Sequence, residues 1–229
     1  MTDRVRQGAP SGGRAPDYVP ALSFHGLTPY YDRVLALTLR ERRFKQALIR
    51  QADIRPGHRV LDLACGTATL TLWIREAEPE AEVRGVDGDA AILELARRKA
   101  QAAGIDLPLD QALSDDLPYP DGHFDRVLSC LFFHHLDRDA RRRTAAELYR
   151  IMKPGAQLHV ADWGPPANPL MRGLFYGVRL LDGFENTRDN VSGRLPGVFE
   201  SAGFSGLAHR EEFNTVYGTL LLFSAIRGA

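Results

Sequence analysis

One short stretch constrains the fold of this chain more than any other: VLDLACGTATL, from Val60 to Leu70. The apolar residues around Asp62 predict a buried strand, and the small residues from Ala64 to Ala68 predict a tight turn that leads into a helix. Such a turn lets a ligand approach the backbone, and the amides at the start of the helix offer it hydrogen-bond donors. The stretch therefore predicts a strand-turn-helix unit with a small-molecule site at its turn.

Strands and helices continue to alternate along most of the chain, which is typical of an α/β fold with a parallel sheet covered by helices on both faces. The expected strands are 59–63, 82–86, 107–113, 124–130 and 157–161, and the expected helices are 27–52, 69–78, 89–103, 137–152 and 195–202. Asp89 is the expected N-cap of its helix. Three adjacent arginines, Arg141, Arg142 and Arg143, are expected on a solvated helix face.

The C-terminal part departs from this alternation. Two apolar segments, 207–213 and 216–226, are separated by a hairpin-length turn, so we expect them to pair antiparallel. Residues 163–190 are rich in aromatic and apolar side chains, and we expect them to form a lid over the site. A lid of this composition favours an apolar or aromatic substrate.

Composition limits the classes of partner and location. The chain has 29 basic and 29 acidic side chains among 229 residues, so nothing in its charge calls for nucleic acid. No run reaches the roughly 18 apolar residues of a membrane span, and two cysteines make no disulfide framework. We expect a cytoplasmic protein without stable membrane insertion or bound metal, with a homodimer as one option for its assembly. Residues 1–20 are expected to be a disordered tail, and 21–229 a single domain.

A second acidic residue indicates the kind of ligand. Asp87 ends the second expected strand, 21 residues after Gly66. Because the carboxyl ends of parallel strands meet at one edge of a sheet, this carboxylate is expected beside the turn. A carboxylate in that position can accept hydrogen bonds from both hydroxyls of a ribose. The pair therefore predicts a ligand that contains adenosine.

Four motifs, in this order and at these intervals, resemble the class I S-adenosylmethionine-dependent methyltransferases, and most closely the branch of ubiquinone and menaquinone biosynthesis methyltransferases. They are VLDLACGTATL at 60–70, GVDGD at 85–89, LPYPDGHFDRVLSCLFFHHL at 117–136 and KPG at 153–155. The resemblance implies a Rossmann-like three-layer sandwich with strand order 3-2-1-4-5-7-6, strand 7 antiparallel, and an N-terminal helix. It also implies S-adenosylmethionine as the cofactor and a small molecule as the methyl acceptor.

The resemblance further implies which residues hold the cofactor. They are Asp62, Ala64, Cys65, Gly66, Asp87, Gly88, Leu113, Ser114 and Cys130. Ala64 and Gly66 would face the methionine part, Asp87 would hold the ribose, and Cys130 would lie beside the methionine part.

Two positions depart from the family pattern. Ala64 and Ala68 replace the outer glycines of the turn, and Ala68 is free of strain only at a negative φ, since a positive φ adds roughly 1 kcal/mol. Leu113 stands where the family has an acidic residue for the adenine amino group. Asp115 or Asp116 could take over this contact if the loop register shifts, with the Ser114 amide facing the ring.

The acceptor site leaves weaker signals, because a sulfonium methyl group is already electrophilic and needs only an acceptor held in line in a dry pocket. His134 and His135 follow the fourth strand, and either is a candidate base for a phenol-like acceptor. The alternative is that one packs and the other caps a helix. Tyr31 in the N-terminal helix, and Asp162 with Trp163 after the fifth strand, are further candidates to line the site.

Other interpretations remain open at this point. Cys65 and Cys130 follow neighbouring strands and could couple by oxidation, although two unrelated buried thiols are the simpler view. The turn is also compatible with a nicotinamide-dependent oxidoreductase. A non-catalytic cofactor-binding or partner subunit, a methyltransferase acting on a phospholipid headgroup, and a cofactor use other than methylation are further alternatives.

Overall fold

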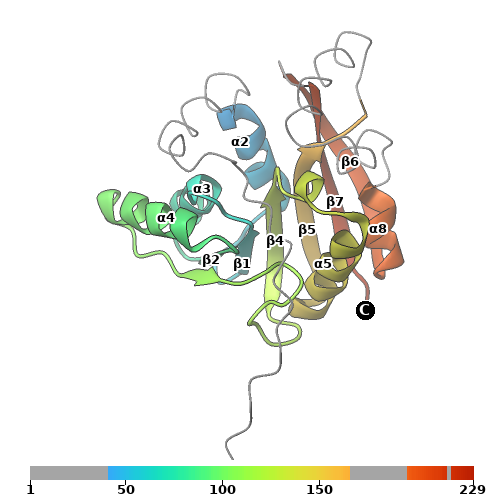
Figure 1. Ribbon diagram of the computed structural model, residues 1–229, viewed down its shortest axis with the longest axis horizontal. Helices are drawn as coiled ribbons and strands as arrows, with labels where there is room; N and C mark the ends of the chain where they lie inside the picture. Colours follow the sequence, from blue (N-terminus) through green and yellow to red (C-terminus); the bar gives the residue numbers. More distant parts are fainter. Residues whose placement is uncertain (1–40, 166–194, 216–217) are drawn as a thin grey trace, which may run out of the picture.

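The computed structural model describes residues 41–165, 195–215 and 218–229, and these form one α/β unit built on a single sheet (Figure 1). In chain order the elements are α2 (Glu41–Ala52), β1 (Arg59–Leu63), α3 (Thr69–Ala77), β2 (Glu82–Asp87), α4 (Ala90–Ala102), β3 (Leu109–Gln111), β4 (Phe124–Cys130), the 3-10 helix η1 (Phe133–His135), α5 (Arg138–Ile151), β5 (Met152–Trp163), α8 (Leu195–Ser201), β6 (Phe204–Thr215) and β7 (Gly218–Arg227).

The sheet has seven strands in the order β3-β2-β1-β4-β5-β7-β6. The pairs from β3 to β5 are parallel, whereas β7 lies antiparallel to both β5 and β6. This confirms the predicted strand order and the single antiparallel strand. The carboxyl ends of β1, β2, β4 and β5 therefore meet at one edge, where an open α/β sheet forms its ligand crevice.

Helices cover both faces of the sheet (Figure 1). Side chains alternate along a strand, so Leu128 and Val127 of β4 point to opposite faces. Leu128 packs in a cluster with Phe44 of α2 and with residues of α3, and a smaller cluster joins α3 to α4. Val127 packs with Leu148 of α5 and Phe199 of α8. The two faces thus have separate apolar cores.

The observed boundaries differ from the expected ones mainly in three strands, of which β6, at Phe204–Thr215, is longer than the expected 207–213. β3 is shorter than the expected 107–113 and spans Leu109–Gln111. β5 begins at Met152, directly after α5, because the expected turn at 153–155 is an irregularity within the strand, with Gly155 at φ 79°. Asp89 is the N-cap of α4, as predicted, and its carboxylate accepts the amides of Ala91 and Ile92.

The two edges of the sheet differ in length and regularity. β3, at one edge, has three residues. β6, at the other edge, has 12 residues and two register shifts against β7, between Ser205 and Ala208 and between His209 and Glu211. One edge is therefore short, and the other has an irregular hydrogen-bonding pattern.

Some expected features lie outside the described residues. They include the 1–20 tail, Tyr31, and most of the 163–190 segment that we expect to be a lid. Among the helices of the described ranges, none is long and apolar enough to cross a membrane.

Candidate active site

The turn between β1 and α3 has three residues in the left-handed region: φ is 56° at Ala64, 55° at Gly66 and 60° at Ala68. The Cys65 amide donates to the Val86 carbonyl at 3.0 Å, and the Ala68 amide donates to the Cys65 carbonyl at 2.9 Å. These bonds hold the turn tightly against β2. The negative φ that would spare Ala68 from strain is absent, so two alanines adopt a conformation that suits glycine.

Small residues leave room on the open side of this turn and fill the closed side. A Cβ atom added to Gly66 would meet no atom of the described residues within 4 Å. A Cβ atom added to Gly85 would lie 2.9 Å from Cys65 Sγ and 2.7 Å from Leu109 Cδ2. The Cys65 side chain therefore packs over β2, and the backbone at Gly66 borders open space.

The structure brings Asp87 to the turn, as the sequence predicts. Its Oδ2 accepts the Gly66 amide at 2.9 Å and its Oδ1 accepts the Asp89 amide at 3.0 Å. Burial raises the pKa of Asp87, and these amide bonds oppose the rise. Each carboxylate oxygen has a second lone pair, so the group retains capacity to accept two hydroxyls. Gly88 follows directly, and its carbonyl accepts the Gln111 side-chain amide at 3.4 Å.

Asp62 lies beneath the turn and is 1% exposed. Thr71 of α3 donates its hydroxyl to Asp62 Oδ2 at 2.6 Å. Burial raises the pKa of Asp62 to about 6, although the Thr71 bond and the nearby charge of Lys45 oppose the rise. Asp62 is therefore a second carboxylate at the carboxyl edge, on the face covered by α2 and α3.

Leu113 and Ser114, the residues expected beside the adenine ring, lie in the loop after β3. Leu113 is 41% exposed, and the Ser114 hydroxyl forms a hydrogen bond of 2.8 Å with Thr144 of α5. Asp115, the alternative acidic residue, accepts Arg143 Nε at 2.8 Å. Gln111 occupies the last position of β3, a residue the sequence reading passed over because it placed the strand end two residues later.

The two cysteines are free thiols with different surroundings. Cys65 faces Gly85, whereas Cys130 packs in the α2-side cluster, close enough to Lys45 and Asp62 to feel their charges. Burial raises the pKa of Cys65 well above its ordinary value and that of Cys130 to about 12. Because the thiolate is the form that oxidises, these environments favour the view of two unrelated buried thiols.

A buried His–Asp pair joins η1, which follows β4, to the carboxyl end of β5. His134 Nδ1 is 2.8 Å from Asp162 Oδ1, which also accepts the Trp163 amide at 2.7 Å. Burial alone would raise the pKa of Asp162, but the interactions with His134 outweigh burial and lower it. The adjacent His135 ring lies 3.9 Å from that of His134, centroid to centroid, and burial followed by His134 lowers its pKa to about 3.

The environment predicted for Arg141 from the sequence is wrong. It was expected on a solvated face with Arg142 and Arg143, yet it is 2% exposed. Its Nε donates to the Phe133 carbonyl at 2.9 Å and so ties α5 to η1, which carries His134. A periodic pattern shows which residues share a helix face, but three consecutive arginines occupy different directions around the helix, so one of them points inward.

The residues predicted from the sequence also did not include Glu41 and Lys45. They lie on the stripe of α2 that includes Phe44 and Leu48, and they form an ion pair with side-chain exposures of 6% and 13%. The signal was available, because positions 41, 44, 45 and 48 fall on one helix face. Charged residues on the apolar face of a helix are unusual enough to single out.

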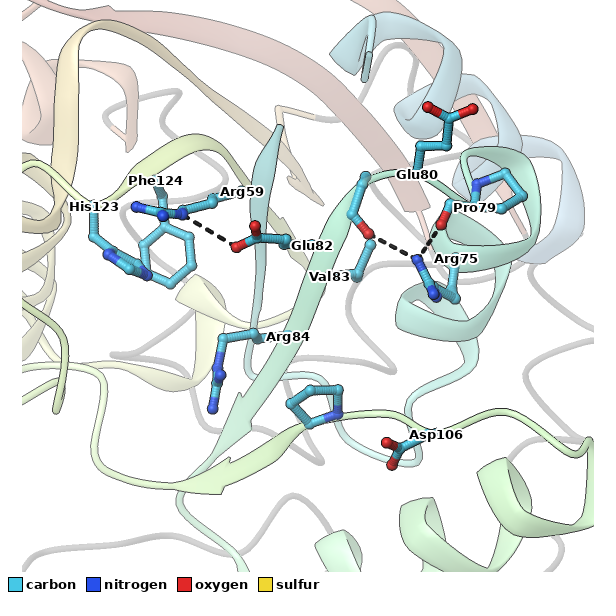
Figure 2. A pocket seen from close by; sticks show the side chains of 12 residues that line it. Arg59, Arg75, Pro79, Glu80, Glu82, Val83, Arg84, Asp106, His123 and Phe124 are labelled. Atoms are coloured by element: carbon cyan, nitrogen blue, oxygen red, sulfur yellow. Dashed lines mark hydrogen bonds and ion pairs between the residues drawn. The ribbon is translucent and has the colours of Figure 1, made fainter. Parts of the chain in front are cut away.

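A separate hollow of about 530 Å³ lies at the opposite edge of the sheet, at the amino ends of β1 and β2 (Figure 2). Its rim includes the Arg59–Glu82 ion pair, with Arg84 and His123 nearby. This edge is remote from the carboxyl ends where Asp62, Asp87 and Cys130 gather. The hollow is therefore separate from the candidate site at the carboxyl edge.

Comparison with known proteins agrees with this geometry. Residues 60–155 match the methyltransferase domain family. The chain is 35% identical to the demethylmenaquinone methyltransferase of Thermus thermophilus over 179 residues, which is 77% of this chain and 78% of that protein. It is 30% identical to the ubiquinone/menaquinone biosynthesis C-methyltransferase of Syntrophotalea carbinolica, over 89% of this chain and 92% of that one.

Solved structures share the architecture at low sequence identity. The YcgJ protein from Bacillus superposes with a TM-score of 0.67 at 18% identity, over 82% of this chain and 99% of that one. The fold, the turn with its two carboxylates, and the family match lead to one conclusion: the chain belongs to the class I S-adenosylmethionine-dependent methyltransferases, in the branch of the ubiquinone and menaquinone biosynthesis enzymes.

Proposed function

We propose that this chain transfers the methyl group of S-adenosylmethionine to a ring carbon of a reduced quinone-type aromatic molecule. The observation that carries the proposal is the buried His134–Asp162 pair, joined at 2.8 Å at the carboxyl edge. The printed names of the relatives support this acceptor class, since they describe a demethylmenaquinone methyltransferase and a quinone-pathway C-methyltransferase.

The described residues fit the cofactor. The turn borders open space at Gly66, where a bound nucleoside can approach the backbone. Asp87 is fixed by two amides and retains acceptor capacity for two ribose hydroxyls. Asp62 and Cys130 form a largely buried floor toward the methionine end, which disfavours water around a reacting sulfonium.

The chemistry requires a proton acceptor on the protein. When bound, S-adenosylmethionine supplies an electrophilic methyl group on sulfur. His134 takes the proton of a ring hydroxyl, and the resulting anion is electron-rich at the neighbouring ring carbon. A bound S-adenosylmethionine would supply its methyl group to that carbon and would leave as S-adenosylhomocysteine, with the electron pair of the broken bond on sulfur. The ring hydrogen then leaves as a proton to restore aromaticity.

Asp162 makes His134 suitable for this role. Its carboxylate oxygen lies 2.8 Å from Nδ1 and fixes the orientation of the ring. The same carboxylate stabilises the imidazolium once it forms. His135 is less suited, because a pKa of about 3 makes its ring a weak proton acceptor. We therefore assign the base to His134 and a packing role to His135.

The test is transfer of a radiolabelled methyl group to a reduced 3-prenyl-1,4-naphthoquinone that carries hydrogen at position 2. The matched control acceptor is the 2-methyl compound, which lacks the acceptor position. We expect label in the first and none in the second. Phosphoethanolamine and phosphatidylethanolamine serve as alternative acceptors, and label on these instead would overturn the quinol assignment.

A pair of variants separates chemistry from binding. His134→Gln should lower kcat on the quinol by about 100-fold or more, the range for loss of a general base, and leave the affinity for S-adenosylhomocysteine unchanged. Asp87→Asn should weaken that affinity by about 1–3 kcal/mol, since it loses a charged acceptor. Cofactor binding without transfer to any acceptor would indicate a non-catalytic subunit.

A further inference from the structure

The ion pair between Glu41 and Lys45 is buried where the helix meets the sheet. Both residues lie on the α2 face that packs against β4 and β5, next to Phe44 and Leu48. Their side chains are 6% and 13% exposed. Arg42 and Arg43, which follow Glu41 in the sequence, are exposed. The helix therefore has solvent-exposed positions for charged residues, yet Glu41 and Lys45 lie on its buried face.

Burial of two charges needs a compensating role. Removing an ammonium and a carboxylate from water carries a penalty of several kcal/mol per ion, which a single pair regains only with good geometry and further hydrogen bonds. An apolar pair at these positions would extend the core formed by Phe44 and Leu48 without that penalty. A functional ligand is the simplest reason to keep the charges.

The neighbours of the pair indicate where that ligand lies. Burial alone would lower the pKa of Lys45, but Cys130, Glu41 and Asp62 are close enough to raise it above its ordinary value. The charges of Lys45, Asp62, Glu41 and Asp162 in turn affect the pKa of Cys130. The pair therefore lies on the same side as the site floor of Asp62 and Cys130, where α2 packs against β4 and β5.

A ligand that matches this pair carries one positive and one negative group close together. We propose that Glu41 and Lys45 form a clamp for the amino-acid end of S-adenosylmethionine, with Lys45 on its carboxylate and Glu41 on its ammonium. Within the described ranges, Glu41 takes one of the three donors of the Lys45 ammonium, and two remain for the ligand. The inference rests on the proposed function, because it assumes the adenosyl cofactor.

The first test compares two ligands by calorimetry with the full chain. S-Adenosylhomocysteine carries the amino-acid end, whereas 5′-methylthioadenosine lacks it. Lys45→Met should weaken binding of the first by about 10- to 100-fold, the range for a lost charged hydrogen bond, and leave the second unchanged. Arg43→Met, an exposed basic residue of the same helix, is the matched control and should change neither affinity.

A third ligand assigns the two charges separately. The decarboxylated analogue of S-adenosylhomocysteine keeps the ammonium and lacks the carboxylate. Glu41→Gln should weaken its binding by a similar factor, and Lys45→Met should not weaken it. Equal loss of all three ligands in Lys45→Met would show a structural defect and overturn the clamp.

The wild-type protein provides a test without substitution. It should bind S-adenosylhomocysteine at least 10-fold more tightly than 5′-methylthioadenosine, and equal affinities would overturn the clamp even where a variant fails to fold. If neither nucleoside binds, the proposed function itself fails. Tight binding of both nucleosides with no effect of Lys45→Met removes the clamp and leaves the proposed function standing.

Discussion

Two alanines at the β1–α3 turn occupy backbone conformations that glycine adopts without strain. Ala64 and Ala68 have φ values of 56° and 60°. They differ in packing, because Ala68 is fully buried against Leu72 and Ala96 of the α3–α4 cluster, whereas Ala64 is half-buried. The same substitution should therefore have different effects at the two positions.

Ala64→Gly should stabilise the protein by about 0.5–1 kcal/mol, because relief of roughly 1–2 kcal/mol of left-handed strain exceeds the extra chain entropy of glycine. Ala68→Gly should be close to neutral, since the relieved strain is offset by loss of a buried methyl group worth about 0.8 kcal/mol. Urea denaturation of both variants measures the difference. A less stable Ala64→Gly would contradict the strain assignment.

At the scale of elements, Arg141 joins α5 to η1. Its guanidinium is buried and bonds to the Phe133 carbonyl. Arg141→Met should lower the free energy of unfolding by about 1–3 kcal/mol, because it leaves a buried carbonyl without this donor. Arg142→Met, an exposed neighbour, should change it by less than about 0.5 kcal/mol. Equal effects of Arg141→Met and Arg142→Met in thermal unfolding would contradict the role of Arg141 in joining α5 to η1.

The interface between α2 and β5 contains a buried histidine. Gln51 of α2 contacts His159 Nδ1 at 3.2 Å and donates to the Phe223 carbonyl at 3.0 Å. Burial, followed by the charges of Arg126 and Arg210, lowers the pKa of His159 to about 3. The folded state therefore keeps this ring neutral at pH values where the unfolded chain protonates it.

This difference gives stability a defined dependence on pH. Between the ordinary histidine pKa near 6.5 and about 3, the unfolded chain binds more protons, so stability is retained above pH 6.5 and lost as the pH falls. The slope from this residue approaches about 1.4 kcal/mol per pH unit. In denaturation experiments at pH 4–7, the free energy of unfolding of His159→Leu should fall less steeply with decreasing pH than that of wild type. His209→Gln, which replaces an exposed histidine, should keep the wild-type dependence of this free energy on pH.

For the molecule as a whole, the sequence predicted the parts that depend on order and periodicity. Alternating apolar runs predicted the sheet with helices on both faces, and the resemblance supplied the strand order. The position of Asp87 beside Gly66 followed from the meeting of parallel strand ends. The depth of Arg141 and of Lys45 did not follow, because charge predicts exposure and only tertiary packing decides which charged side chain points inward.

The two outermost strands also bear on how copies of this molecule meet one another. A net charge of zero removes the repulsion that usually keeps molecules apart near neutral pH. An open flat strand would then be a template for cross-molecule hydrogen bonding. The three-residue β3 offers little length for such bonding, and β6 breaks its pattern at two shifts and displays charged side chains such as Arg210 and Glu212. The two outermost strands thus disfavour filament growth in a molecule whose zero net charge does little to oppose it.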